Sequence, residues 1–132
     1  MGVLMVGSVW NDAPIMDELP HIPAGYSYLV KKDYRLNPEH PPLIKMIAAL
    51  PLLFLDLDFP EDSPHWKDDI NGQWDFGRDF LYRSGNDADS IVFWARMPII
   101  ILALATGWVV FWYLRLRASI GVALITLAMY TL

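Results

Sequence analysis

The stretch Met97-Pro98-Ile99-Ile100-Ile101-Leu102-Ala103-Leu104-Ala105-Thr106-Gly107-Trp108-Val109-Val110-Phe111-Trp112-Tyr113-Leu114 decides the fold class, because it runs for 18 residues without a charge. A helix rises about 1.5 Å per residue, so this run would be roughly 27 Å long, close to the hydrocarbon thickness of a bilayer. The whole chain of 132 residues is 55% hydrophobic, but its apolar residues are concentrated in such runs. We therefore predict an all-α membrane protein with a transmembrane helix over residues 91–114.

Two shorter apolar runs lie at the ends of the chain. Residues 118–132 form a second run of 15 residues, whereas a spanning helix needs about 20. Val3–Trp10 is an apolar run of 8 with no basic residue before it, which is a poor match to a signal peptide. We interpret residues 1–10 as the end of a first transmembrane helix and residues 118–132 as a truncated one. The chain is then expected to be a fragment of a larger polytopic protein.

The charged residues are segregated along the chain. All 15 acidic residues and seven of the 10 basic residues lie between residues 11 and 90, so this segment is strongly acidic. Arg115 and Arg117 lie in the short link between the two C-terminal apolar runs. The positive-inside rule places that link in the cytoplasm. We therefore expect a multi-pass protein of the cell membrane with an extracytoplasmic loop over residues 11–90, and no nucleic-acid partner.

Within this loop, two juxtamembrane helices are predicted, at about residues 22–32 and 42–55. Pro20 and Pro23 suit the first turn of the first helix, where a missing N–H has no cost. Pro41-Pro42 open the second helix, which is apolar apart from Lys45. Residues 56–90 are acidic and aromatic, with glycines that interrupt regular structure, and we expect one short helix near Phe76–Tyr82.

Ionisable side chains are gathered at the start of the loop. Asp17 and Glu18 could cap a helix N-terminus, or one carboxylate could act as a general base in a site that partly excludes water. His21 and His40 could bind a metal ion with Asp17 or Glu39, although their spacing matches no standard zinc pattern.

A small basic set follows them. Lys31, Lys32, Arg35 and Lys45 could either reach toward anionic lipid or hold a phosphate group. Lys45 is the strongest candidate for a phosphate contact in this set, because it is the only charged residue in its apolar helix.

Two motifs together resemble a known family. Asp17-Glu18-x-x-His21, followed by Pro38-Glu39-His40-Pro41-Pro42-Leu43-x-Lys45, resembles the first extracytoplasmic loop of the dolichyl-phosphate-mannose–protein mannosyltransferases and their bacterial relatives. These enzymes are glycosyltransferases of the GT-C superfamily that use polyprenyl-phosphate sugars. The resemblance covers essentially the whole chain but only the first part of the family's usual length. It implies a polytopic helical GT-C fold.

The resemblance also implies a reaction and its residues. A sugar would pass from a polyprenyl-phosphate donor to a hydroxyl of a protein, lipid or glycan at the outer face of the membrane, with inversion at the anomeric carbon. Asp17 would be the base or acceptor-orienting acid, with Glu18 beside it. The resemblance and the basic set together assign the donor phosphate to His40, Lys45 and Arg35, with possible support from His21, Glu39 and Arg96.

The predicted ligands are thus a membrane lipid, the donor and the acceptor. No cofactor is certain from the sequence and no metal ligand is assigned, although a divalent metal is possible. The alternative is a small non-catalytic membrane protein whose acidic outer loop binds a partner or a metal. A fragment with only half of the site is expected to be inactive alone.

Overall fold

The computed structural model describes residues 1–10 and 12–131, and all regular structure in these ranges is helical, as predicted. Asn11 and Leu132, which belong to the predicted segments 11–90 and 118–132, lie outside the described residues. The α-helices are α1 (Gly2–Val9), α2 (Glu18–Val30), α3 (Pro42–Ala49), α4 (Pro64–Lys67), α5 (Gln73–Arg78), α6 (Ala88–Arg117) and α7 (Ile120–Thr131). A 3-10 helix, η1 (Leu50–Phe54), continues α3, and a π-helix, η2 (Asp79–Arg83), continues α5.

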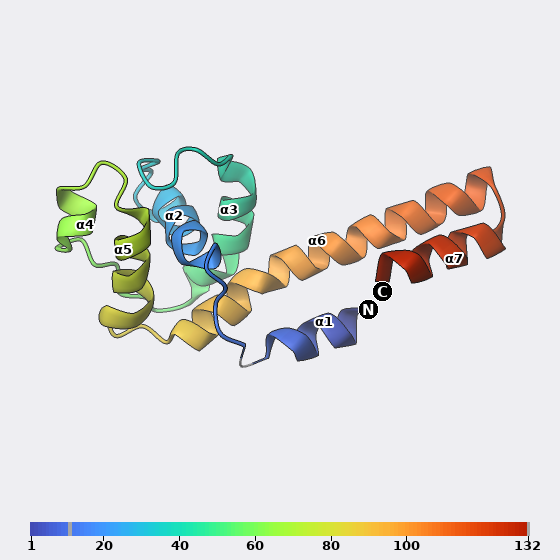
Figure 1. The fold of residues 1–132 in the computed structure, drawn as a ribbon, viewed down its shortest axis with the longest axis horizontal. Coiled ribbons are helices and arrows are strands. Elements are labelled where there is room, and N and C mark those ends of the chain that lie inside the picture. The colour runs from blue at the N-terminus through green and yellow to red at the C-terminus, as the bar shows by residue number, and fades with distance from the viewer. Residues whose placement is uncertain (11, 132) are drawn as a thin grey trace.

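Helix α6 is the axis on which the other elements are placed. The short helices α2 to α5 gather around its N-terminal end, while α7 runs back along its C-terminal part and α1 lies beside it (Figure 1). The Asp87 side chain accepts a hydrogen bond from the backbone N–H of Ser90 and so caps the start of α6. Arg115 and Arg117 lie in its last turn, where cations complement the helix dipole.

Within residues 1–10 and 12–131, α6 is the one helix long and apolar enough to cross a membrane. Its 30 residues correspond to about 45 Å, and they include the predicted span 91–114. Only 11% of its most apolar window is buried in the structure, whereas the core helix of a soluble protein would be mostly buried.

Helix α7 packs closely on α6 through a glycine. A Cβ on Gly107 would lie 3.2 Å from the ring of Tyr130, so this ring would have to shift slightly to admit a larger residue. The Tyr130 hydroxyl donates a hydrogen bond to the carbonyl of Ala103, 3.1 Å away. These contacts make α6 and α7 an antiparallel pair.

The helices at the start of α6 enclose a separate apolar core. Its members are almost fully buried, and each large apolar side chain buried in this way contributes about 1.5–3 kcal/mol to folding. They include Ile22, Tyr28, Leu36, Leu52, Phe76, Phe80, Leu81, Ile91 and Val92. Phe59 lies at the edge of this core and packs on Trp66 and Phe76, so these aromatic residues of the 56–90 segment pack the loop, whereas Trp74 and Tyr82 are exposed.

Helix α2 differs from its predicted bounds, since it begins at Glu18 rather than at residue 22. Pro23 consequently lies inside the helix and not in its first turn, and it cannot donate a hydrogen bond to the carbonyl of Leu19. Gly77 of α5 packs directly against that carbonyl, where a Cβ would clash. Packing of α5 on α2 therefore outweighs the local cost of the proline, which the sequence alone cannot show.

The other predicted helices correspond closely to observed elements. The segment 42–55 contains α3 and η1, and Pro42 occupies the first turn of α3. The segment Phe76–Tyr82 falls within α5 and η2. Gly25 allows α3 to pack tightly on α2, because a Cβ at this position would clash with the backbone carbonyl of Lys45.

Candidate functional site

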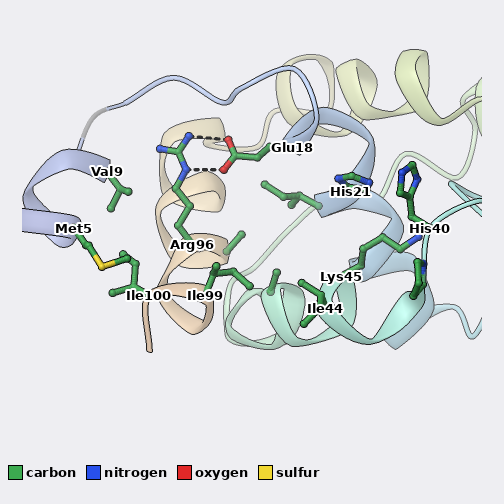
Figure 2. A pocket seen from close by; sticks show the side chains of 14 residues that line it. Met5, Val9, Glu18, His21, His40, Ile44, Lys45, Arg96, Ile99 and Ile100 are labelled. Carbon is green, nitrogen blue, oxygen red and sulfur yellow. Dashed lines mark hydrogen bonds and ion pairs between the residues drawn. The ribbon is translucent and has the colours of Figure 1, made fainter. Parts of the chain in front are cut away.

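A cavity of about 520 Å³ lies where α1, α2 and α3 meet α6 (Figure 2). One part of its wall is apolar and is formed mainly by Met5, Val9, Ile44, Ala48, Ile99 and Ile100. The polar side chains of the wall are Glu18, His21, His40, Lys45 and Arg96. The surface of the cavity is almost entirely apolar, and both sequence motifs contribute ionisable residues to its wall.

Glu18 and Arg96 form the best-defined contact at this cavity. Arg96 Nε and Nη2 each donate to a Glu18 carboxylate oxygen at 2.7 Å, so the pair is bidentate (Figure 2). Only 12% of the Arg96 side chain and 21% of the Glu18 side chain are exposed, which places this pair among the stronger kind of ion pair. It joins the start of α2 to α6 across 78 residues of sequence.

The remaining donors of Arg96 are also engaged. Its Nη2 donates to the carbonyl of Ala13 at 3.0 Å, and its Nη1 lies 3.5 Å from the Asp12 carboxylate. The Glu18 carboxylate additionally accepts from the backbone N–H of Ile15 at 2.9 Å. Arg96, which was predicted as a supporting residue, therefore binds Glu18 and also holds Asp12 and Ala13, which precede α2.

Asp17 is the N-cap residue of α2, but its side chain makes no capping hydrogen bond. It is exposed and lies just outside the cavity wall, next to Glu18. Burial lowers the pKa of His21, one of the lining residues, and the negative charge of Asp17 offsets a small part of this lowering. The capping interpretation of Asp17 is thus not what the structure shows.

Lys45 is buried, with 5% of its surface exposed, and all three hydrogens of its ammonium are used inside the protein. Its Nζ donates to the Asn37 carbonyl at 2.6 Å, to Asn37 Oδ1 at 2.8 Å and to the Tyr28 hydroxyl at 2.9 Å. Burial lowers the pKa of Lys45 and raises the pKa of Tyr28 to about 12. Lys45, which was predicted to contact the donor phosphate, is therefore a buried cation at the cavity wall whose hydrogen bonds hold the protein's own structure.

The same network holds the loop that carries the second motif. Asn37, at φ 50°, donates from its side chain to Gln73, and Gln73 donates to the Glu39 carboxylate at 2.6 Å. Glu39 therefore faces α5 and not the cavity. Sequence reasoning missed Tyr28, Asn37 and Gln73. The lone lysine in an apolar helix could have indicated that such partners exist, because a buried ammonium requires buried hydrogen-bond acceptors.

His21 and His40 come together at the polar end of the cavity. Their ring centroids are 5.0 Å apart and the rings meet edge to face. They belong to α2 and to the loop before α3, and Figure 2 shows them side by side next to Lys45. Burial, followed by the charges of His40 and Lys45, lowers the pKa of His21.

Arg35 is not brought to this cavity. Its guanidinium binds Asp33, donates to the carbonyl of Trp66 at 2.9 Å and stacks over the Trp66 ring, 4.7 Å from the ring centroid. This corrects the prediction that Arg35 shares a phosphate site with His40. An aromatic ring offers an arginine a cation–π partner that spacing in sequence does not reveal.

Within the part of the chain that the structure describes, no three His, Asp or Glu side chains are grouped closely enough to hold a metal ion. A divalent metal therefore stays a prediction. In comparisons with known proteins, no protein-family model, no curated protein and no solved structure matches this chain.

Proposed function

We propose that this chain is part of a membrane glycosyltransferase that moves a sugar from a polyprenyl-phosphate donor to a hydroxyl acceptor. One observation carries the proposal: the first motif, through Glu18 and His21, and the second motif, through His40, Pro41 and Lys45, line one cavity whose surface is almost entirely apolar. An apolar surface suits the isoprenoid chain of such a donor, and the ionisable residues of the wall provide charge near its phosphate.

The placement of the cavity supports a reaction at the membrane surface. It lies toward the N-terminal end of α6, where Ile99 and Ile100 of the predicted span form part of the wall. If α6 crosses the bilayer with Arg115 and Arg117 on the cytoplasmic side, the cavity faces the opposite side. A lipid-linked donor could then enter from the membrane while its phosphate stays near the polar side chains.

The proposed step is a displacement with inversion. The acceptor oxygen forms a bond to the anomeric carbon, and the bond between that carbon and the phosphate oxygen breaks with its electron pair leaving on the polyprenyl phosphate. The proton of the acceptor hydroxyl passes to the Asp17 carboxylate. The leaving phosphate is an anion that requires positive charge nearby rather than a proton, and the buried Lys45 supplies such charge.

The two carboxylates have different parts in this proposal. Glu18 is occupied by Arg96 and fixes the start of α2. Asp17, next to it, has an exposed carboxylate that can accept a proton. Glu18 is therefore a positioning residue, and Asp17 is the proposed base.

Transfer can be measured in membranes from cells that express the complete enzyme of which this chain is proposed to be a part, since such membranes also supply native acceptors. Undecaprenyl- or dolichyl-phosphate carrying a radiolabelled hexose would be the donor probes, and label recovered in protein or lipid fractions would report transfer. Asp17→Asn should reduce transfer at least about 100-fold, because the general base is lost. Asp56→Asn, at an exposed carboxylate of the loop, is the matched control and should leave transfer unchanged.

Full transfer by the Asp17→Asn variant would remove Asp17 from the mechanism. No transfer by the complete wild-type protein from any of these donors would overturn the proposed function itself.

A further inference from the structure

Large aromatic side chains occur at two levels along α6. Near its start, Phe93 packs on Trp94 and also meets the ring of Trp10, the C-cap residue of α1, edge to face with centroids 5.4 Å apart. Near its end, the guanidinium of Arg115 stacks over the Trp112 ring, 4.9 Å from the ring centroid. Trp is enriched where a membrane meets water, and arginine at a helix end reaches toward that boundary. Each level therefore has the composition of a membrane–water boundary.

The spacing of the two levels matches a lipid bilayer. Trp94 and Trp112 are 18 residues apart, which is about 27 Å along a helix, and the hydrocarbon core is about 30 Å thick. Asp89 and Arg117 are 28 residues apart, or about 42 Å, which matches a bilayer with its headgroups. Trp108 is exposed as well, but a boundary at Trp108 would leave only about 21 Å for the hydrocarbon. The spacing therefore favours boundaries at Trp94 and Trp112.

The surface of α6 between these two levels suits hydrocarbon. Leu102 and Val109 are among its exposed side chains. Thr106 brings a hydroxyl to this surface, and that hydroxyl donates to the Leu102 carbonyl at 2.9 Å. The charge of Arg96, near the start of this surface, is paired with Glu18. Polar groups in hydrocarbon require internal partners of this kind.

The 3-10 helix η1 carries an exposed aromatic side chain to the level of Trp94. Phe54, the last residue of η1, is 90% exposed. Leu52, two residues before it, is buried in the same core as Ile91 and Val92, and η1 contacts α6. Phe54 therefore lies near the start of α6, where a ring open to water would lose the free energy that burial in an apolar medium provides.

Exposed apolar side chains continue from Phe54 back along η1 and α3. They include Leu53, Leu50 and Leu43. Lys45 is the only charged residue between residues 42 and 54, and it is turned into the protein, where its ammonium binds Asn37. An exposed apolar patch of this kind marks a site of contact with a membrane or a protein. Because the patch adjoins α6, the helix long enough to cross a bilayer, its position favours lipid as the partner.

We propose that a lipid bilayer meets this protein at two boundaries, Trp94 and Trp112, and that Phe54 enters the bilayer at the Trp94 boundary. The exposed α3–η1 patch then contacts lipid of one leaflet, and Trp10 anchors the end of α1 at the same level. The body formed by α2 to α5 rests on the membrane surface through this patch. This proposal concerns contact with lipid and does not depend on the proposed sugar transfer.

Spin labels on single cysteines test the proposal, because the chain has no cysteine of its own. The labelled full chain is placed in phosphatidylcholine vesicles. Electron paramagnetic resonance then measures collisions of the label with oxygen, which concentrates in lipid, and with a charged nickel chelate, which stays in water. The ratio of oxygen to nickel collisions should be at least about fivefold higher for Phe54→Cys than for Asp62→Cys, because hydrocarbon excludes the chelate. Asp62→Cys is the matched control, since the Asp62 side chain is 99% exposed.

Two further labels test the boundaries on α6. Ile101→Cys lies about 10 Å past Trp94 and should give the highest ratio, whereas Leu116→Cys lies about 6 Å beyond Trp112 and should be reached by the chelate. Both native side chains are exposed. Equal ratios at these two positions would overturn the boundaries.

The label at residue 54 distinguishes lipid from the other possible surroundings. Frequent collisions with the chelate would place Phe54 in water and overturn its contact with lipid. Rare collisions with both reagents would mean that protein covers the patch, which would overturn this contact as well. Sugar transfer is not measured in this experiment, so each of these outcomes leaves the proposed function standing.

Discussion

Replacing Lys45 with Met tests whether this residue is a buried structural cation. Methionine has a similar length and no charge, so the change removes the ammonium with little change in volume. Three hydrogen bonds are lost, of 2.6, 2.8 and 2.9 Å, and two of their acceptors belong to Asn37, which is 2% exposed. Tyr28 retains its own donor bond to Leu36.

The size of the effect follows from these contacts. Each buried acceptor left without a partner costs about 1–3 kcal/mol, and the desolvation of the ammonium that is no longer needed offsets part of this cost. We expect the Lys45→Met variant to lose about 2–4 kcal/mol of unfolding free energy. For a chain of this size that corresponds to a decrease in Tm of roughly 10 °C.

Thermal unfolding followed by far-ultraviolet circular dichroism in detergent micelles would measure this decrease. Lys67→Met is the matched control, since Lys67 is half exposed and pairs only with the exposed Asp62, and it should cost less than about 1 kcal/mol. An unchanged Tm for Lys45→Met, combined with strongly weakened binding of undecaprenyl phosphoglucose, would refute the reasoning. The ammonium would then be directed at the ligand and not at Asn37.

Two further predictions concern helix packing and histidine titration. Gly25→Ala should destabilise the protein by at least about 2 kcal/mol in the same unfolding assay, because the new Cβ clashes with a backbone carbonyl of α3, whereas Gly7→Ala meets no atom within 4 Å and should be neutral or mildly stabilising. A destabilised Gly7→Ala with an unaffected Gly25→Ala would contradict the packing described here. In ligand-free protein, NMR titration should place the pKa of His21 below 6.5 and that of His65 above it, because burial disfavours the charged form of His21 while Asp69 favours that of His65. Since the unfolded chain binds a proton at residue 21 more readily than the folded one, His21 lowers stability as the pH falls below 6.5, and the opposite order of the two pKa values would refute this assignment.

Local signals in the sequence were sufficient for much of the helical architecture. The uncharged run 97–114 lies inside α6. Pro41 is the N-cap residue of α3, and Pro42 is the first residue of that helix. These features depend on neighbours a few residues apart, through hydrophobic length and the missing N–H of proline. The start of α2 was not predicted, because Pro23 lies inside this helix and the close packing of Gly77 from α5 against the Leu19 carbonyl joins residues far apart in the sequence.

The residues of the candidate site were also only partly predictable from the sequence. The resemblance of the two motifs to a known family made Asp17, Glu18 and His40 candidates for one site, and the residue types around Lys45 show that it stands alone among apolar residues. Only the tertiary structure decided that Glu18 pairs with Arg96, 78 residues away, and that Arg35 stacks on the Trp66 ring.

The uncharged run 97–114 thus determined by itself that a long apolar helix would form, since helix formation and hydrophobic length are properties of a continuous segment. What the polar groups beside it do was decided by the tertiary structure. The ammonium of Lys45 points into a network with Asn37 and Tyr28, while the rings of His21 and His40 meet edge to face at the cavity. The physical reason is that a side chain's hydrogen-bond partners depend on which elements pack together, and packing joins residues whose separation in the chain carries no signal.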